Sequence, residues 1–252
     1  YMTAADIDEI TAMISDFGFL PLVIPDLSSG VDGSKENFIS MSPNGTSYDE
    51  IVSAGRSELT FSFGNSMKPA GDFLKAEFGV RHYFIDSIYG LTKTDNFITT
   101  LMEASSGTEV AHRIVKERAR LRDIMIDTHL HLNNKNAALA MEYDQALAMR
   151  YFLNEIGVNS AAAISPFVPS PETEISQGTL YDLEEYLVTG GEIDIIYANT
   201  HGKELASNFG IPLVHAGFPV SDVYGYNYRL NVGYKGGISM ISTLANLILE
   251  KK

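Results

Sequence analysis

The 252-residue sequence contains no cysteine and no tryptophan. Without cysteine the chain has no disulfide, no thiolate nucleophile, and no thiolate ligand for zinc or an iron–sulfur cluster. This composition is compatible with a reducing compartment, and we expect the cytoplasm. No apolar run approaches the ~20 residues that a membrane helix needs. The first ten residues, YMTAADIDEI, are too polar for a signal peptide.

Basic residues are scarce as well. The chain has 18 Lys and Arg against 32 Asp and Glu, which gives a net charge of −14. Nucleic acid is therefore not an expected partner, because phosphate contacts need clustered Lys and Arg. An anionic membrane surface is disfavoured for the same reason. The length and the 45% hydrophobic content are sufficient for one large domain or two small ones with a proper core.

Short apolar runs alternate with helical patterns along most of the chain. Thr3, with Asp6 three residues later, is expected to cap a first helix. Strands are expected at 19–26, 58–64, 80–86, 136–142, 159–166, 192–200 and 211–219. Strands that alternate with helices through short connections predict parallel sheets covered by helices. The predicted fold class is therefore α/β, with two doubly wound, Rossmann-like parallel-sheet domains.

The boundary between these domains is expected near residue 108. We call residues 1–108 the first unit and residues 109–235 the second unit. The last helix, within 236–252, has an apolar face and no strand after it. It is therefore expected to cross back and pack on the first unit.

His129 and His131, just after Asp127, have the H-x-H spacing with which some metal-dependent hydrolases begin their barrels. The surrounding residues, 109–132, have the apolar period of one long helix. On a helix, residues two apart point about 200° away from each other, so this pair cannot share a metal ion. A barrel would also need more chain after the motif. A helix C-terminus is the preferred interpretation, and the metal hydrolase remains a third hypothesis.

Three residues are candidates for a ligand-binding cleft: Ser66, Asn199 and His201. Ser66 lies between a strand and a helix N-terminus, where backbone N–H groups can bind an anion. Asn199 and His201 follow a strand, at the edge where α/β sheets bind ligands. Ordinary turns and helix caps are the plainer interpretation of all three. No G-x-G-x-x-G after a strand, no G-K-[ST] and no G-x-S-x-G occurs, so no catalytic residue and no metal ligand is predicted.

Three stretches, taken in order, resemble one family. KERARLRDIMIDTHLHLNNKNAALAMEYDQALAMRYFLNEIG, residues 116–157, resembles the central helix, strand and helix of nitrogenase component 1-type proteins. YANTHGKELASNFGIPLVHAGFPVSDVYGYNYRLNVGYKGG, residues 197–237, resembles their closing segment. IPDLSSGVDG, residues 24–33, resembles a turn after an early strand. The resemblance extends over nearly the whole chain and implies a nitrogenase component 1-like fold.

Three short motifs indicate a branch of that family. DTH at 127–129, NTHG at 199–202 and DLSSGVDG at 26–33 favour the scaffold subunits that support biosynthesis of the iron–molybdenum cofactor for nitrogen fixation. The catalytic β subunit is second, and the dark-operative protochlorophyllide reductase subunits are third. The resemblance implies a homologous sister subunit in an α2β2 scaffold, an ATP-dependent iron protein as reductase partner, and iron–sulfur or iron–molybdenum precursor clusters in the full assembly.

The chain also departs from the family. Members are longer, with three α/β domains, and their β-type subunits contribute cluster-ligating cysteines from the first domain. This sequence resembles the later part and has no cysteine, so we expect a fragment with no cofactor and no catalytic site of its own. Contact between β-type halves across a two-fold axis implies weak self-association. The alternative from another class is a bilobal small-ligand binding protein with a cleft between its lobes.

Overall fold

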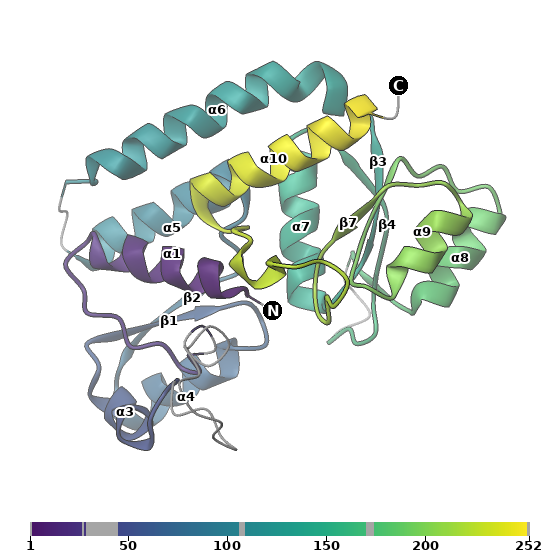
Figure 1. The fold of residues 1–252 in the computed structure, drawn as a ribbon. Coiled ribbons are helices and arrows are strands. Elements are labelled where there is room, and N and C mark those ends of the chain that lie inside the picture. Colours follow the sequence, from purple (N-terminus) through teal and green to yellow (C-terminus); the bar gives the residue numbers. More distant parts are fainter. Residues whose placement is uncertain (1, 27, 29–44, 106–108, 170–173, 251–252) are drawn as a thin grey trace.

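The computed structural model describes residues 2–26, 28, 45–105, 109–169 and 174–250. Figure 1 shows parallel sheets flanked by helices, so the α/β fold class is confirmed. The helices are α1 (Ala4–Ser15), α3 (Tyr48–Ser53), α4 (Lys68–Phe78), α5 (Gly90–Ala104), α6 (His112–Leu132), α7 (Tyr143–Glu155), α8 (Leu180–Val188), α9 (Gly202–Asn208) and α10 (Gly233–Glu250). The strands are β1 (Leu59–Phe63), β2 (Arg81–Ile85), β3 (Asn136–Ala140), β4 (Asn159–Ser165), β5 (Ser176–Gln177), β6 (Ile195–Ala198) and β7 (Leu213–His215).

The first unit contains a parallel pair, β1 and β2. The rings of Phe61 and Phe63 in β1 pack edge-on against Phe97 of α5, with centroid distances of 5.7 Å and 5.5 Å. The prediction of a strand at 19–26 is wrong, because residues 19–26 form no strand in the structure. Pro21 and Pro25 have no N–H to donate to a ladder. The DLSSGVDG motif that follows lies largely outside the described residues.

The second unit contains a five-stranded parallel sheet in the order β5-β4-β3-β6-β7. From the central strand β3 the chain continues to β4 and β5 on one side, and later to β6 and β7 on the other. This reversal makes the carboxyl ends of β3 and β6 the topological switch point, where open α/β sheets bind ligands. The two-residue strand β5 was not expected from the sequence, because it is too short to show a pattern.

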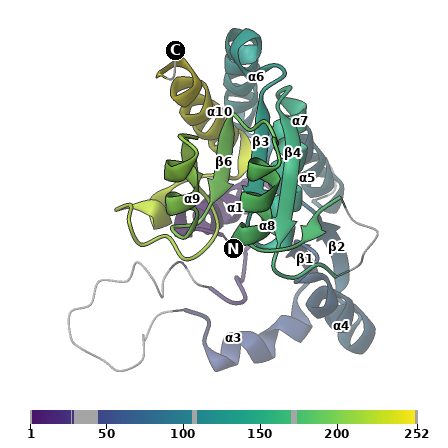
Figure 2. The same ribbon diagram turned by 90° about the vertical axis from the view of Figure 1, so that its right-hand side faces the viewer.

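Both faces of the second sheet are covered, which explains why its strands are apolar runs without alternation. Figure 2 looks onto the face covered by α8 and α9, where Ala138 and Ile196 meet Leu183 and Leu205. The opposite face packs against α7 and joins a larger core. That core includes buried residues of α1, α5, α6, α7 and α10, so it extends across both units: Met13, Phe97, Leu121, Phe152 and Leu244.

The long helix expected at 109–132 is confirmed as α6, His112–Leu132. Helix α10 lies along both α6 and α5 (Figure 1), so it contacts the second unit as well as the first. Residues 106–108 lie outside the described residues, and the division of the chain near 108 stays a prediction. Within the described ranges, no helix is both long and apolar enough to cross a membrane.

Candidate functional site

The turn after β1 contains the first predicted cleft residue, Ser66. Its backbone N–H donates to Asp144 Oδ2 at 2.8 Å. Asn65 donates to Asp144 Oδ1 through its backbone N–H at 2.8 Å and its side-chain amide at 2.9 Å. This turn therefore binds an anion, as its position before a helix suggests, but the anion is a carboxylate from α7 of the second unit. A role for Ser66 toward an external ligand stays a prediction.

The turn after β6 contains the other two predicted residues. The Asn199 amide donates to the Phe218 carbonyl at 3.0 Å, and its Oδ1 accepts the His201 backbone N–H at 3.0 Å. Asn199 therefore caps the turn into α9 and connects it to the segment after β7. The His201 side chain is exposed. The structure brings Asn199 and His201 together, whereas Ser66 is bound to Asp144.

A polar cluster around Asp222 fixes the segment that follows β7. The Thr200 hydroxyl donates to Asp222 Oδ1 at 2.8 Å and accepts the Ser221 N–H at 2.8 Å. Lys203 Nζ lies 3.0 Å from Asp222 Oδ2, and His215 Nε2 lies 3.0 Å from Oδ1. The Thr200 hydroxyl, followed by the Lys203 ammonium, holds the pKa of Asp222 well below its usual range.

The Asp222 cluster predicts a pH dependence. A carboxyl whose pKa is depressed in the folded state stabilises that state above its unfolded pKa of about 4, and this contribution decreases as the pH falls further. Asp222→Asn should therefore melt below the wild type between pH 5 and pH 7 (roughly the plateau expected from linkage), and the difference should shrink as the pH falls below about 4. Thermal melts at a series of pH values test this. Asp127→Asn, at an exposed position of α6, is the control, and a difference independent of pH would contradict the prediction.

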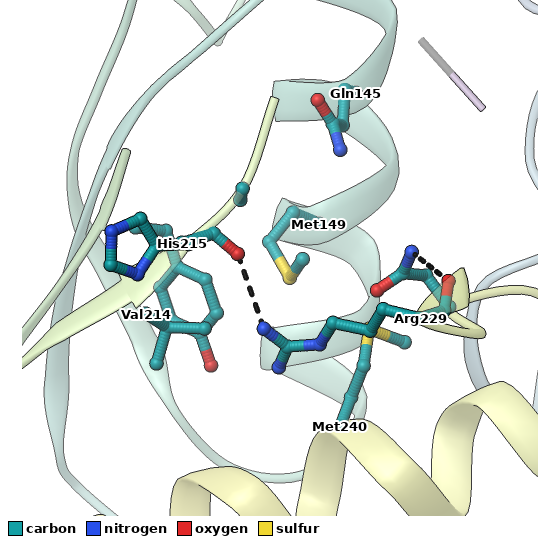
Figure 3. Close-up of a pocket in the computed structure, with 9 residues that line it drawn as sticks. Gln145, Met149, Val214, His215, Arg229 and Met240 are labelled. Atoms are coloured by element: carbon teal, nitrogen blue, oxygen red, sulfur yellow. Dashed lines mark hydrogen bonds between the residues drawn. The ribbon is translucent and has the colours of Figure 1, made fainter. Parts of the chain in front are cut away.

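A small cavity lies between β6, β7, α7 and α10 (Figure 3). Its volume is about 10 Å³, the space of about one water molecule. Arg229 enters it and donates to the His215 carbonyl at 3.3 Å. Gln145, from α7, has a buried Oε1 without a hydrogen-bond partner among the described residues. This cavity therefore has space for a water molecule and not for a cofactor.

The histidine pair of the sequence lies on α6, as its period predicted. His129 is exposed and its Nδ1 lies 2.7 Å from the Ile126 carbonyl, within its own helix. His131 is half-buried. In the described parts of the chain, no three His, Asp or Glu side chains converge as metal ligands do. Because iron–sulfur clusters are held chiefly by thiolates and the sequence has no cysteine, these residues do not fit such a cluster.

The sequence reasoning missed several residues that organise these edges. The missed residues are Asp144, Gln145, His215, Asp222 and Arg229. One feature of the sequence could have indicated a role for Asp144. Glu142, two residues before it, can cap α7, and in the structure it binds the first N–H groups of that helix. That arrangement leaves the Asp144 carboxylate available to another element. The other four line the cavity or belong to the cluster around Asp222, and only the folded chain brings them to these places.

Comparison with known proteins identifies the family to which this fold is similar. The family described as Nitrogenase component 1 type Oxidoreductase matches residues 1–249. The nitrogenase iron–molybdenum cofactor biosynthesis protein NifN of Rippkaea orientalis is 33% identical over 266 residues, which cover 100% of this chain and 57% of that protein. The nitrogenase molybdenum–iron protein beta chain of Clostridium pasteurianum is 30% identical, covering 100% of this chain and 58% of that protein.

A solved structure agrees with these relatives. The structure described as Nitrogenase Cp1 at pH 6.5 superposes with a TM-score of 0.91 and 29% identity, over 100% of this chain and 58% of that chain. The chain thus spans a little over half the length of the curated relatives it matches. The resemblance found from the sequence is confirmed at the level of the family.

Proposed function

Because this chain belongs to the nitrogenase component 1 type oxidoreductase family, we propose that it is part of a scaffold subunit for biosynthesis of the iron–molybdenum cofactor, in support of nitrogen fixation. One observation carries the proposal. Several curated relatives that cover 98% or more of this chain, at 30–33% identity, are named as iron–molybdenum cofactor biosynthesis proteins. The DTH and NTHG motifs of the sequence favour the same branch.

A second candidate is the catalytic counterpart, the molybdenum–iron protein β subunit. It is favoured by the Clostridium pasteurianum beta chain at similar identity and by the TM-score of 0.91 with Nitrogenase Cp1. A bilobal ligand-binding protein gains no support from the small cavity in Figure 3, because its volume is only about 10 Å³. The metal-hydrolase hypothesis loses its support, because both histidines of its motif lie on α6 and not on a strand.

A reconstitution experiment separates the two candidates. Deleting the gene in its host should abolish nitrogenase activity under either one. If the chain belongs to the scaffold, isolated iron–molybdenum cofactor added to the mutant extract should restore acetylene reduction, because the product of the scaffold has been supplied. If the chain belongs to the catalytic subunit, the added cofactor should restore nothing, and the scaffold proposal is then wrong.

The scaffold role also proposes partners. A homologous sister subunit would complete an α2β2 assembly in the cytoplasm, and an ATP-dependent iron protein would dock on it. Precursor clusters would be bound by other parts of that assembly, because this chain offers no thiolate ligand. The residues of this chain would contribute structure and interfaces to that assembly.

The outer face of α6 supports weak self-association between two such chains. Val115, Ile126 and Leu130 are 54%, 66% and 80% exposed. If two copies of α6 cross antiparallel between Arg122 and Asp123, Val115 meets the partner's Leu130. Arg122 then meets the partner's Asp123. The face is thus complementary to itself in both apolarity and charge, which a two-fold axis requires.

Replacing the central apolar residue of this face should weaken self-association. Ile126→Glu should raise the dimer dissociation constant by about tenfold or more, because a charge replaces an apolar contact about one helical turn from the axis. Sedimentation velocity over a concentration series measures this. Val188→Glu, at a 71% exposed position of α8, is the matched control. Equal dissociation constants for the two variants would exclude α6 as the contact.

A further inference from the structure

Helix α7 belongs to the second unit, since it follows β3 and packs on the second sheet. In Figure 1 it stands between that sheet and α5 of the first unit. It carries a carboxylate in its first turn, Asp144, and another at its last residue, Glu155. Both carboxylates bind backbone N–H groups of the first unit.

At one end, Asp144 is held by Asn65 and Ser66. Three donors lie at 2.8 to 2.9 Å from its two oxygens. Burial raises the pKa of Asp144, but the hydrogen bonds from Ser66 and Asn65 outweigh burial and lower it. The first N–H groups of α7 itself are bound by Glu142 instead. Asp144 therefore serves the contact with the first unit.

At the other end, Glu155 accepts the backbone N–H of Leu91 and that of Thr92, each at 2.7 Å. These are two of the first N–H groups of α5, a 15-residue helix whose N-cap residue, Tyr89, makes no side-chain cap. An anion at this position also interacts favourably with the helix dipole. Glu155 thus caps a helix of the first unit from 63 residues or more away along the chain.

A glycine lines each contact. Gly64 has φ +80° and Gly90 has φ +79°. A Cβ at Gly64 would lie 2.8 Å from Asp144 Oδ2, and one at Gly90 would lie 2.3 Å from Glu155 Oε2. Both positions therefore need glycine for two reasons: the left-handed backbone conformation and the close approach of the carboxylate. Two contacts on opposite ends of one helix share the same construction.

We propose that Asp144 and Glu155 form a two-point latch that sets the orientation of the second unit relative to the first. Each carboxylate fills a backbone anion site on the first unit, three helical turns apart on α7. The shared core also joins the two units, and two contacts three turns apart restrict their relative orientation more narrowly than one contact would. The latch therefore determines the combined surface that both units present to a neighbouring subunit. This role is independent of whether the scaffold or the catalytic candidate is correct.

Distances between spin labels test the latch on the whole chain. Because the sequence has no cysteine, Glu77→Cys on α4 and Glu185→Cys on α8, both exposed, carry labels at those two positions only. The background with the latch intact should give a single narrow distance peak. Asp144→Ala and Glu155→Ala should each lose that narrow peak, and the double variant should show the broadest distribution. In Asp144→Ala, added formate should restore the narrow peak by filling the empty anion site.

Asp182→Ala is the matched control. Asp182 also lies in the first turn of a helix, but it accepts the N–H of its own N-cap, Thr179, at 2.7 Å. This variant should lower the melting temperature without changing the distance distribution, and formate should not affect the distribution. If the double variant does not fold, the single variants and Asp144→Asn carry the test. A distance peak that stays narrow in the folded Asp144 and Glu155 variants would show that both residues are only helix caps, and would overturn the proposal.

Discussion

A chain that ends before Gly236 should lose its cooperative unfolding transition. The truncation removes most of α10, whose inner face is buried against α5 and α6. Met240, Ile241, Leu244 and Ile248 are between 0% and 7% exposed. Burial of each such side chain contributes about 1.5–3 kcal/mol, so the four together approach the ~5–15 kcal/mol that separates folded from unfolded domains. Circular dichroism melts of the truncated and full chains measure the loss.

A single substitution gives a graded form of the same test. Leu244→Ala should lower the free energy of unfolding by about 2–5 kcal/mol, because it leaves a cavity at a fully buried position. Leu249→Ala, on the same helix but 44% exposed, should cost less than about 1 kcal/mol. Urea titrations of both variants measure these changes in the free energy of unfolding. A truncated chain that melted at the temperature of the full chain would show that α10 does not stabilise this fold.

The second large effect is expected at Asp6, in the first turn of α1. Its carboxylate is buried and accepts the backbone N–H groups of Thr3, Asn231 and Val232 at 2.7 to 3.2 Å. The side-chain amide of Asn231 donates to it as well. Asp6 therefore fastens the N-terminal helix to the segment that leads into α10.

Asp6→Ala should lower the free energy of unfolding by about 3 kcal/mol or more, since each buried donor left without an acceptor costs about 1–3 kcal/mol. Asp6→Asn should be nearly as damaging, because its NH2 group would face N–H donors. Asp8→Ala, exposed on the same helix, should stay within about 0.5 kcal/mol of the wild type. Urea unfolding measures stability, and hydrogen exchange of the Asn231 and Val232 amides reports the local contact. Equal stability of Asp6→Ala and Asp8→Ala would contradict this assignment.

Several features were predictable from the sequence because they depend on neighbouring residues. The apolar period of residues 109–132 predicted the helix now seen as α6, and with it the separation of His129 from His131. Alternation of apolar runs with helical patterns predicted the parallel sheets and the α/β class. The family resemblance came from motifs that are contiguous in the chain, and the matched family confirms it.

The candidate site was less predictable. Ser66, Asn199 and His201 were correctly placed after strands, but the sequence could not show what each would contact. The anion at Ser66 comes from Asp144, 78 residues later. The two prolines in residues 19–26 limited the predicted strand to an edge or an end of a sheet, and the structure has no strand there. Whether an apolar run joins a sheet depends on a neighbouring strand that the local pattern does not contain.

Asp6 has one role that the sequence determined and another that only the tertiary structure decided. The sequence by itself determined its capping role: Thr3 and Asp6 are three residues apart, and the two exchange hydrogen bonds of 3.0 and 3.1 Å in one helical turn. Only the tertiary structure decided its second role, because Asn231 lies 225 residues away. A cap is fixed by backbone geometry within one turn, whereas a contact at that separation forms only when the packed core has already brought the two segments together.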